Sequence, residues 1–262
     1  MERYKKILEK LAHTSMPREE FLRAIYAQAG LYSSAESEYE LLKAYGVPLE
    51  ESEGQIYLST AKTPYKEQRF CIVDIETNGS LSAKDQVIEL GAILYERGAM
   101  IDSFESLVFC KEIPEYITKI TGITAEMLQD APNMREVLER FRLFLGDSVF
   151  VAHNVGFDYG FLDAMMERCS LGFLCNRRLC TIDLAHKTIP AQRYSLPFLN
   201  EFLGIHTALS HRAYADALTA LRVFEESLKH IPPEVRTTEE LISFSHANKS
   251  PKSPKKTRRQ IP

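Results

Sequence analysis

The sequence lacks a long apolar run. No stretch of its 262 residues approaches the roughly 18 consecutive apolar residues that a membrane-spanning helix needs. The first ten residues are rich in charged side chains and contain no apolar core of the kind found in export signals. We therefore predict a soluble protein that is not exported and that works in the cytoplasm.

Paired cysteines are also missing. The five cysteines are an odd number, and no two of them form a Cys-x-x-Cys pair. This usage is typical of reduced thiols in the cytosol, so we expect no disulfide framework.

Most of the chain carries no excess of positive charge. The net charge is −4, and residues 249–262 hold six basic side chains and no acid, so the rest of the chain has a net charge of −10. An acidic body argues against broad contact with the phosphates of duplex nucleic acid, but it permits a local site where metal ions supply the positive charge. We predict that residues 232–262 form a basic, disordered tail. Its basic end could contact phosphates or a polymerase subunit.

Residues 1–66 are predicted to be a separate helical extension. Apolar side chains recur at helical spacing in residues 2–12 and 17–29. A third helix is expected after the capping-box pattern Ser33-x-x-Glu36 and is expected to end at Gly46. A short hairpin up to Leu58 would complete the outline of a winged helix, although no recognition helix is basic. The alternative is a helical extension that packs on the main domain or on a partner.

Residues 67–231 are predicted to form an α/β domain. Apolar runs separated by turn residues predict three consecutive strands, and the later segments alternate between helices and short buried strands. The order β-β-β-α-β-α-β-α implies a mixed sheet flanked by helices. The expected strands cover residues 70–79, 87–95, 100–109, 149–152 and 179–182, and the expected helices fall within residues 114–145, 157–169 and 213–229.

Two acids share one face of the first strand of this domain. Side chains alternate along a strand, so Asp74 and Glu76 point to the same side, about 6–7 Å apart. At an effective dielectric constant of about 20, two unit charges at this distance repel by roughly 2–3 kcal/mol. A distant base, a raised pKa or a bound divalent cation must offset this repulsion.

Two further acids lie beside later elements. Asp158 follows the strand at 149–152, in the first turn of a helix, where it either lines a site at the carboxyl ends of the strands or simply caps the helix. His211 and Asp216 are five residues apart and would lie about 140° apart on one continuous helix. They can reach a common site only if His211 precedes the helix in a loop.

Together these motifs resemble the DEDD superfamily of 3′–5′ exonucleases, in its histidine subclass. The resemblance covers residues 69 to about 230, and its three motifs are Asp74-Ile-Glu76-Thr77, His153-Asn154-x-x-Phe157-Asp158 and His211-x-x-x-x-Asp216. Within the superfamily the chain is most similar to the epsilon proofreading subunits of bacterial DNA polymerase III. Those subunits share sequences similar to Ile120-Thr121-Gly122-Ile123-Thr124 and Ser195-Leu196-x-x-Leu199. The resemblance implies a ribonuclease-H-like fold around a mixed five-stranded sheet.

The resemblance also implies a set of site residues. Two divalent metal ions, Mg²⁺ or Mn²⁺, would be held by four acids, namely Asp74, Glu76, Asp158 and Asp216. Asp74 would bridge the two ions, and His211 would take the proton from the attacking water. Residues expected to hold the terminal nucleotide or to brace the acids are Thr77, Thr121, His153 and Asn154. Many relatives have histidine at the position of Thr121.

The implied activity is a metal-dependent 3′–5′ exonuclease that releases nucleoside 5′-monophosphates from single-stranded or frayed DNA 3′ ends. Proofreading is the expected role, with a DNA polymerase catalytic subunit as a possible partner and no membrane contact. One alternative is a 3′–5′ exoribonuclease, because the sequence does not reveal a pocket that accepts or rejects a 2′-hydroxyl. Another is a non-catalytic polymerase accessory or binding module on the same fold. A module retained only for binding has no need of four acids and a histidine.

Overall fold

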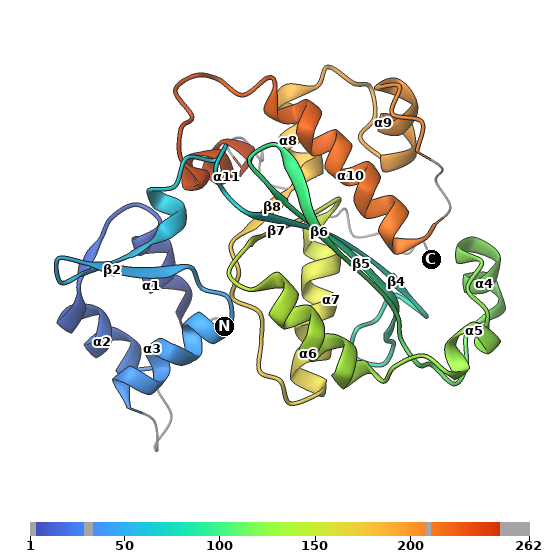
Figure 1. The fold of residues 1–262 in the computed structure, drawn as a ribbon, viewed down its shortest axis with the longest axis horizontal. Helices are drawn as coiled ribbons and strands as arrows, with labels where there is room; N and C mark the ends of the chain where they lie inside the picture. The colour runs from blue at the N-terminus through green and yellow to red at the C-terminus, as the bar shows by residue number, and fades with distance from the viewer. Residues whose placement is uncertain (1–3, 29–33, 208–210, 247–262) are drawn as a thin grey trace, which may run out of the picture.

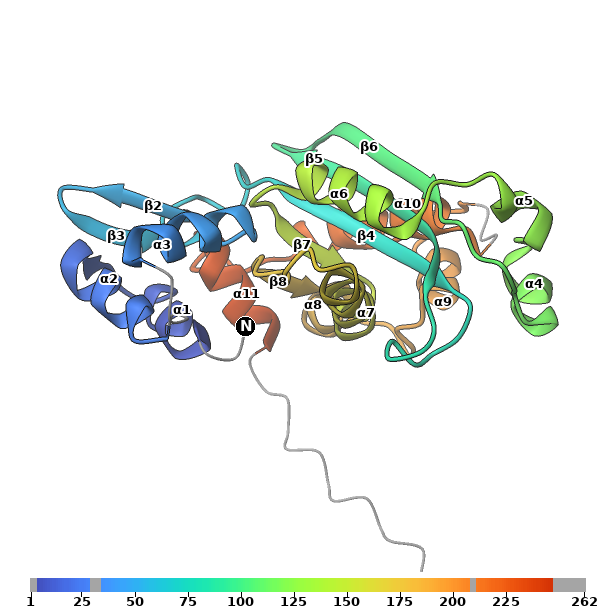
Figure 2. The same cartoon turned by 90° about the horizontal axis from the view of Figure 1, so that it is seen from below.

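The computed structural model describes residues 4–28, 34–207 and 211–246, which form a small N-terminal unit packed beside a larger α/β domain (Figures 1 and 2). In order, the small unit consists of α1 (Lys5–Leu11), β1 (Met16–Pro17), α2 (Arg18–Tyr26), α3 (Ala35–Ala44), β2 (Leu49–Ser52) and β3 (Gln55–Leu58). Its antiparallel sheet has the strand order β1-β3-β2. This order of helices and strands matches the outline expected of a winged helix. The helices and the hairpin were predicted, whereas the two-residue strand β1 was not.

The start of α3 differs from the prediction by one residue. Ser34 is the N-cap, with an extended backbone, and its hydroxyl accepts a hydrogen bond from the backbone N–H of Ser37 at 3.0 Å. The capping box predicted from Ser33 and Glu36 is therefore wrong, because the helix begins one residue later. Ser33 itself lies outside the described residues.

The larger domain is built on a mixed five-stranded sheet, as predicted. Its strands are β4 (Phe70–Thr77), β5 (Val87–Glu96), β6 (Ala99–Leu107), β7 (Val149–Ala152) and β8 (Arg178–Cys180). They lie in the order β6-β5-β4-β7-β8, with β4, β5 and β6 antiparallel and β4, β7 and β8 parallel. The first strand of the domain is therefore its central strand.

Helices cover both faces of this sheet (Figure 1). The side chain of Val73 on β4 packs in a core with α6 (Met134–Leu145) and α7 (Val155–Arg168), whereas that of Ile72 packs in a second core with α8 (Thr181–Thr188) and α10 (Ala213–Leu228). The alternation predicted for β4 is confirmed. Two short helices, α4 (Glu115–Thr121) and α5 (Ala125–Gln129), lie between β6 and α6.

Three helices were not predicted. The expected strand at 179–182 ends at Cys180, where α8 begins, and α9 (Leu196–Phe202) follows. The prediction of a disordered tail from residue 232 is wrong for α11 (Thr238–His246), because Leu241 and Ile242 are buried in the core that contains α8 and α10. Residues 247–262, with all six basic residues of the tail, lie outside the described part of the chain.

Hydrogen bonds tie the two units together. The carboxylate of Glu239 on α11 accepts from the hydroxyl of Thr60, at the end of the small unit, and from Arg177, just before β8, both at 2.7 Å. On the other side of the joint, the carbonyl of Tyr45 accepts from the backbone N–H of Cys175 at 2.8 Å. The small unit is therefore fixed against the α/β domain at two places.

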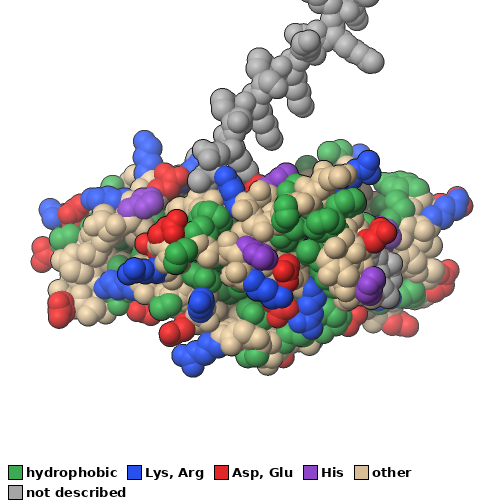
Figure 3. All heavy atoms as spheres, turned by 90° about the horizontal axis from the view of Figure 1, so that it is seen from above, with side chains coloured by type: hydrophobic (Ala, Val, Ile, Leu, Met, Phe, Trp, Pro, Cys, Tyr) green, Lys and Arg blue, Asp and Glu red, His purple; other side chains and the backbone are tan. Residues whose placement is uncertain are grey.

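The surface carries mixed charge. On the face shown in Figure 3, acidic and basic side chains are interspersed, with apolar side chains between them. Across the described ranges, each helix is too short or too polar to cross a bilayer.

Gly91 allows α10 to lie directly against β5. A Cβ atom at Gly91 would lie 2.3 Å from the backbone nitrogen of Tyr214 and 2.5 Å from the carbonyl carbon of Ala213. Backbone atoms cannot rotate away as a side chain can. We expect Gly91→Ala to lower the free energy of unfolding by about 1–3 kcal/mol, measured by urea denaturation.

Gly160→Ala is the matched control for this change. Gly160 lies within α7, and a Cβ atom there would meet nothing within 4 Å. Its replacement should leave stability unchanged or raise it by up to about 1 kcal/mol. An equal loss of stability in the two variants would show that the close approach of α10 is not what Gly91 provides.

Candidate active site

The four predicted acids come from three elements and meet at the end of β4. Asp74 and Glu76 lie on β4, Asp158 lies in the first turn of α7, and Asp216 lies in the first turn of α10. Burial raises the pKa of Asp74 well above its usual value, and the charges of the other three acids raise it further. The structure thus brings all four together, with Asp74 under the influence of each of the others.

The pairing of β4 with β7 explains how Asp158 reaches this site. The two strands are in register only from Phe70 to Ile72, so β4 continues beyond its partner. The chain then turns at Asn154, which has a left-handed backbone with φ of 79°, into α7. Asp158 is 5% exposed, and burial raises its pKa to about 7, although hydrogen bonds from the backbone of Asp158 and Ile75 favour the charged form.

His211 precedes α10, as the predicted site requires. Arg212 is the N-cap of the helix, and His211 lies before it with φ of 45°. One ligand atom from each of Glu76, His211 and Asp216 lies within 4.8 Å of the others. Burial raises the pKa of Asp216, whereas the nearby His211 lowers it. Imidazole and carboxylate therefore face a common point.

The donors at this point suit a divalent cation. Burial, followed by the charge of Asp216, raises the pKa of Glu76 to about 8. The buried Oδ1 atom of Asp216 has no hydrogen-bond partner among the described residues. Hard cations such as Mg²⁺ and Mn²⁺ prefer carboxylate oxygens. A cation would both bind this unpaired oxygen and offset the burial and the repulsion that keep the carboxylates from being charged.

A fifth acid, Glu89, was not predicted. It lies on β5 opposite Glu76 and is 0% exposed. Its carboxylate accepts hydrogen bonds from Arg212 and from the backbone N–H of Ala213. The sequence does carry a signal for it, because a glutamate inside an otherwise apolar strand must be paired when it is buried.

Both ring nitrogens of His153 make hydrogen bonds within the protein. Its Nε2 lies 2.9 Å from the carbonyl of Tyr194, and its Nδ1 lies 2.8 Å from the hydroxyl of Thr181. The carbonyl can only accept, so Nε2 donates and Nδ1 accepts from Thr181. Burial lowers the pKa of His153 to about 4, so the ring is neutral. His153 thus joins the start of α8 to the loop before α9, and direct contact with a nucleotide stays a prediction.

Two of the other predicted substrate contacts, Thr77 and Thr121, also make hydrogen bonds within the protein. Thr77 donates a hydrogen bond to the carbonyl of Gly79 at 2.7 Å, in the turn after β4. Thr121 is 3% exposed, and its hydroxyl donates to the carbonyl of Ile117 and accepts from the N–H of Ile123. The side chain of Asn154 does not cap α7. Nucleotide contact by Thr77, Thr121 and Asn154 therefore also stays a prediction.

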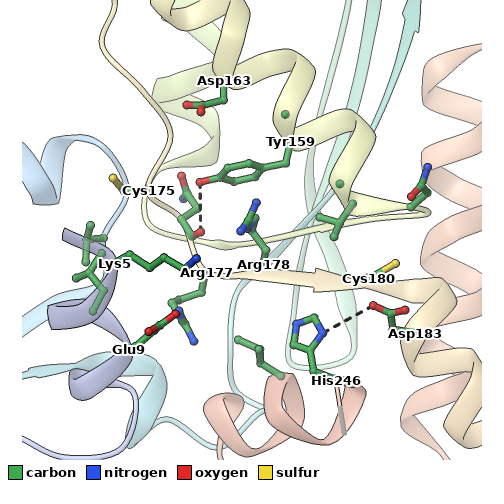
Figure 4. A pocket seen from close by; sticks show the side chains of 18 of the residues that line it. Lys5, Glu9, Tyr159, Asp163, Cys175, Arg177, Arg178, Cys180, Asp183 and His246 are labelled. Carbon is green, nitrogen blue, oxygen red and sulfur yellow. Dashed lines mark hydrogen bonds and ion pairs between the residues drawn. The ribbon is translucent and has the colours of Figure 1, made fainter. Parts of the chain in front are cut away.

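A separate cavity of about 840 Å³ lies between the small unit and the α/β domain (Figure 4). The guanidinium of Arg178 lies over the ring of Tyr159, with 4.6 Å between them, and His246 faces Asp183 at 3.8 Å. Asn154 also lines this cavity, but none of the four acids does. The cavity is therefore distinct from the acid site.

A mixed five-stranded sheet with four acids gathered at the end of its central strand defines a nuclease of the ribonuclease-H-like class. The sequence model of the RNase_T family, described as Exonuclease, matches residues 71–224. This match covers more than half of the chain, and the chain belongs to this exonuclease family. The resemblance to the DEDD-type 3′–5′ exonucleases is confirmed.

The related sequences include DNA polymerases. The chain is 38% identical to DNA polymerase III PolC-type of Staphylococcus haemolyticus over 162 residues, and 36% identical over 162 residues to that of Staphylococcus aureus. The matched segment is 61% of this chain but only 11% of each polymerase. This chain therefore corresponds to a small part of those relatives.

The related structures confirm the fold. E. coli exonuclease I in complex with a dA16 oligonucleotide has a TM-score of 0.56 and 18% identity, covering 63% of this chain and 42% of that one. Exonuclease X in complex with 5′-overhanging duplex DNA has a TM-score of 0.50 and 22% identity, covering 67% of this chain and 99% of that one. At 18% and 22% sequence identity, the similarity shows the fold of the α/β domain alone.

The raised pKa values of the acids predict how stability depends on pH without metal. The pKa values of Glu76 and Asp158 are raised to about 8 and about 7. Because the folded protein holds these two protons more tightly than the unfolded chain, the protonated acids contribute to stability. This contribution is fully present below their unfolded pKa of about 4 and is lost as pH rises through 7–8. In the presence of a chelator, we expect the Tm to fall by several degrees from pH 5 to pH 8.

Added Mg²⁺ should reverse this loss. Thermal unfolding in excess Mg²⁺ should raise the Tm more at pH 8 than at pH 5, because the cation binds the deprotonated acids. Asp74→Asn, which removes the charge that the other three acids act upon, should weaken both effects. A Tm increase by Mg²⁺ that is equal at the two pH values would contradict the cation site.

The lowered pKa of His153 predicts the opposite dependence of stability on pH. Its pKa of about 4 in the folded protein is below its ordinary value of 6.5, so its contribution to stability is present above pH 6.5 and is lost as pH falls through 4. The loss is up to about 3 kcal/mol. We expect His153→Gln to be less stable than the native chain at pH 7, with a smaller difference between them at pH 4.5. Urea denaturation at both pH values tests this, with the exposed His13→Gln as a control that keeps the native pH dependence.

Proposed function

We propose that the chain is a metal-dependent exonuclease that hydrolyses phosphodiester bonds at DNA 3′ ends and releases nucleoside 5′-monophosphates. The observation that carries this proposal is the convergence of four acids and His211 at one sheet edge of a domain from the exonuclease family. A site formed from three separate elements, with an unpaired buried carboxylate oxygen, fits cation-dependent chemistry better than a solvated surface cluster.

Asp74, Glu76, Asp158 and Asp216 would hold two divalent cations, Mg²⁺ or Mn²⁺. When bound, such cations activate water for attack on the phosphorus and neutralise the charge that develops on the phosphate. The position of Asp74 among the other three acids supports a role for it in holding the cations. His211, exposed and next to Asp216, would accept the proton from the attacking water.

DNA is the proposed substrate. The relatives are named as DNA polymerases, and one related structure is a complex with a dA16 oligonucleotide. These likenesses support proofreading for a replicative polymerase in the cytoplasm, with a polymerase catalytic subunit as a partner and single-stranded or frayed 3′ ends as the substrate. The acidic charge outside the tail also favours a short single-stranded end over a long duplex tract.

A nuclease assay tests this proposal. DNA and RNA oligomers of matched sequence, labelled at the 5′ end and carrying a mismatched 3′ end, are incubated with and without Mg²⁺. We expect stepwise shortening of the DNA from its 3′ end only with Mg²⁺. Asp74→Asn should reduce the rate by roughly 1,000-fold, because the stabilisation from bound cations amounts to several kcal/mol.

Asp102→Asn is the matched control, because Asp102 is exposed on the edge strand β6. It should shorten DNA at the native rate. Equal rates for native protein and Asp74→Asn would defeat the proposal. Faster cleavage of RNA than of DNA would instead assign the site to RNA ends.

A further inference from the structure

Building on the proposed function, we infer that the ion pair between the buried Glu89 and the partly exposed Arg212 positions His211 and Asp216 for catalysis. The pair links β5, which carries none of the proposed cation ligands, to the start of α10, which carries two site residues. Glu89 is thus a positioning residue that acts through the backbone of α10.

The register of the sheet places Glu89 at the site. It lies opposite Glu76 in the antiparallel pairing of β4 and β5, and directly opposed residues point to the same face. Gly91 lies two residues further along β5, on that same face, and leaves room for the backbone of Ala213 and Tyr214. Strand β5 therefore provides both the carboxylate that binds the start of α10 and the space that lets the backbone of α10 lie close to the sheet.

Both oxygens of the carboxylate are used. Oε1 accepts from Nε of Arg212 at 2.8 Å and from its Nη2 at 2.5 Å, and Oε2 accepts from the backbone N–H of Ala213 at 2.9 Å. The first N–H groups of a helix have no partner within it, and no side chain of the N-cap residue supplies one here. Glu89, which lies on strand β5, provides the hydrogen-bond acceptor that the side chain of a capping residue usually provides.

This contact fixes the residues on either side of it. Arg212 directly follows His211, and its carbonyl accepts the backbone N–H of Asp216 at 3.0 Å. Holding Arg212 and Ala213 against β5 therefore sets where the loop delivers His211 and where the first turn delivers Asp216. Both must stay near Glu76, and an error of about 1 Å in such a site can cost about 100-fold in rate.

The chain contains a matched pair far from the site. Glu239 on α11 is also buried, at 4% exposed, and accepts from Nε and Nη2 of Arg177 at 2.7 and 2.5 Å. It joins α11 to the segment before β8 and to Thr60. A change at Glu239 therefore breaks the same kind of contact without touching α10.

The experiment compares Glu89→Gln, Arg212→Lys and Glu239→Gln in the full chain. Single-turnover and steady-state cleavage of a single-stranded DNA oligomer with Mg²⁺ give kcat and KM. Hydrogen–deuterium exchange with mass spectrometry, without DNA, follows the amides of residues 211–216. Arg212→Lys keeps the charge and loses the two-point contact, so it tests the geometry if Glu89→Gln folds poorly.

We expect Glu89→Gln and Arg212→Lys to lower kcat at least tenfold, with KM changed less than threefold. Exchange at residues 211–216 should be at least fivefold faster in both. Glu239→Gln should keep kcat within twofold and leave exchange at 211–216 unchanged, although it lowers the Tm.

Two results would overturn the inference. Unchanged exchange at residues 211–216 in both site variants would show that the pair does not hold the start of α10. Faster exchange at residues 211–216 together with a native kcat would show that anchoring the start of α10 is not needed for catalysis. A native protein that cleaves neither DNA nor RNA would refute the proposed function and with it the catalytic part of this inference, while the exchange data would still decide whether the pair anchors α10.

Discussion

Electrostatic repulsion between buried acids is the constraint on which this structure depends. Asp74, Glu76, Asp158 and Asp216 are gathered where burial alone already disfavours their charged forms. Such a cluster is stable only with shared protons or bound cations. The sheet supports it through a central strand that runs past its parallel neighbour and two helices whose first turns close around the strand end. The chemistry proposed here uses that repulsion, because the same charges that oppose burial bind the cations.

Two ion pairs, each between a buried glutamate and a partly exposed arginine, secure the two joints of the molecule. One holds the start of α10 against β5, and the other holds α11 against the α/β domain and the small unit. Breaking such a pair leaves an uncompensated buried charge, so each joint is costly to open. These contacts fix the start of α10 at the acid site and, separately, hold the small unit against the α/β domain.

The small unit is unlike a DNA-reading module. Nucleic-acid-binding units present basic side chains to phosphates, but α3 carries Glu36, Glu38 and Glu40. The segment after α3 is also occupied, because Tyr45 contacts Phe173 and Cys175 of the α/β domain. The unit therefore contributes to the joint between domains, and the cavity of about 840 Å³ is formed between its α1 and α7, β8 and α11.

The sequence alone determined the order of the five strands of the α/β domain, the two faces of β4, the loop position of His211 and the five residues that meet at the candidate site. These features follow from local periodicity and from motifs a few residues long, which neighbouring residues encode. Tertiary structure decided the rest: the fold of α11 at residues 238–246, the neutral ring of His153 and the partner of Glu89. Arg212 is 123 residues from Glu89, and Thr60 is 179 residues from Glu239. No pattern in a short window contains such pairs, because only the packing of the sheet and its helices brings them within hydrogen-bonding distance.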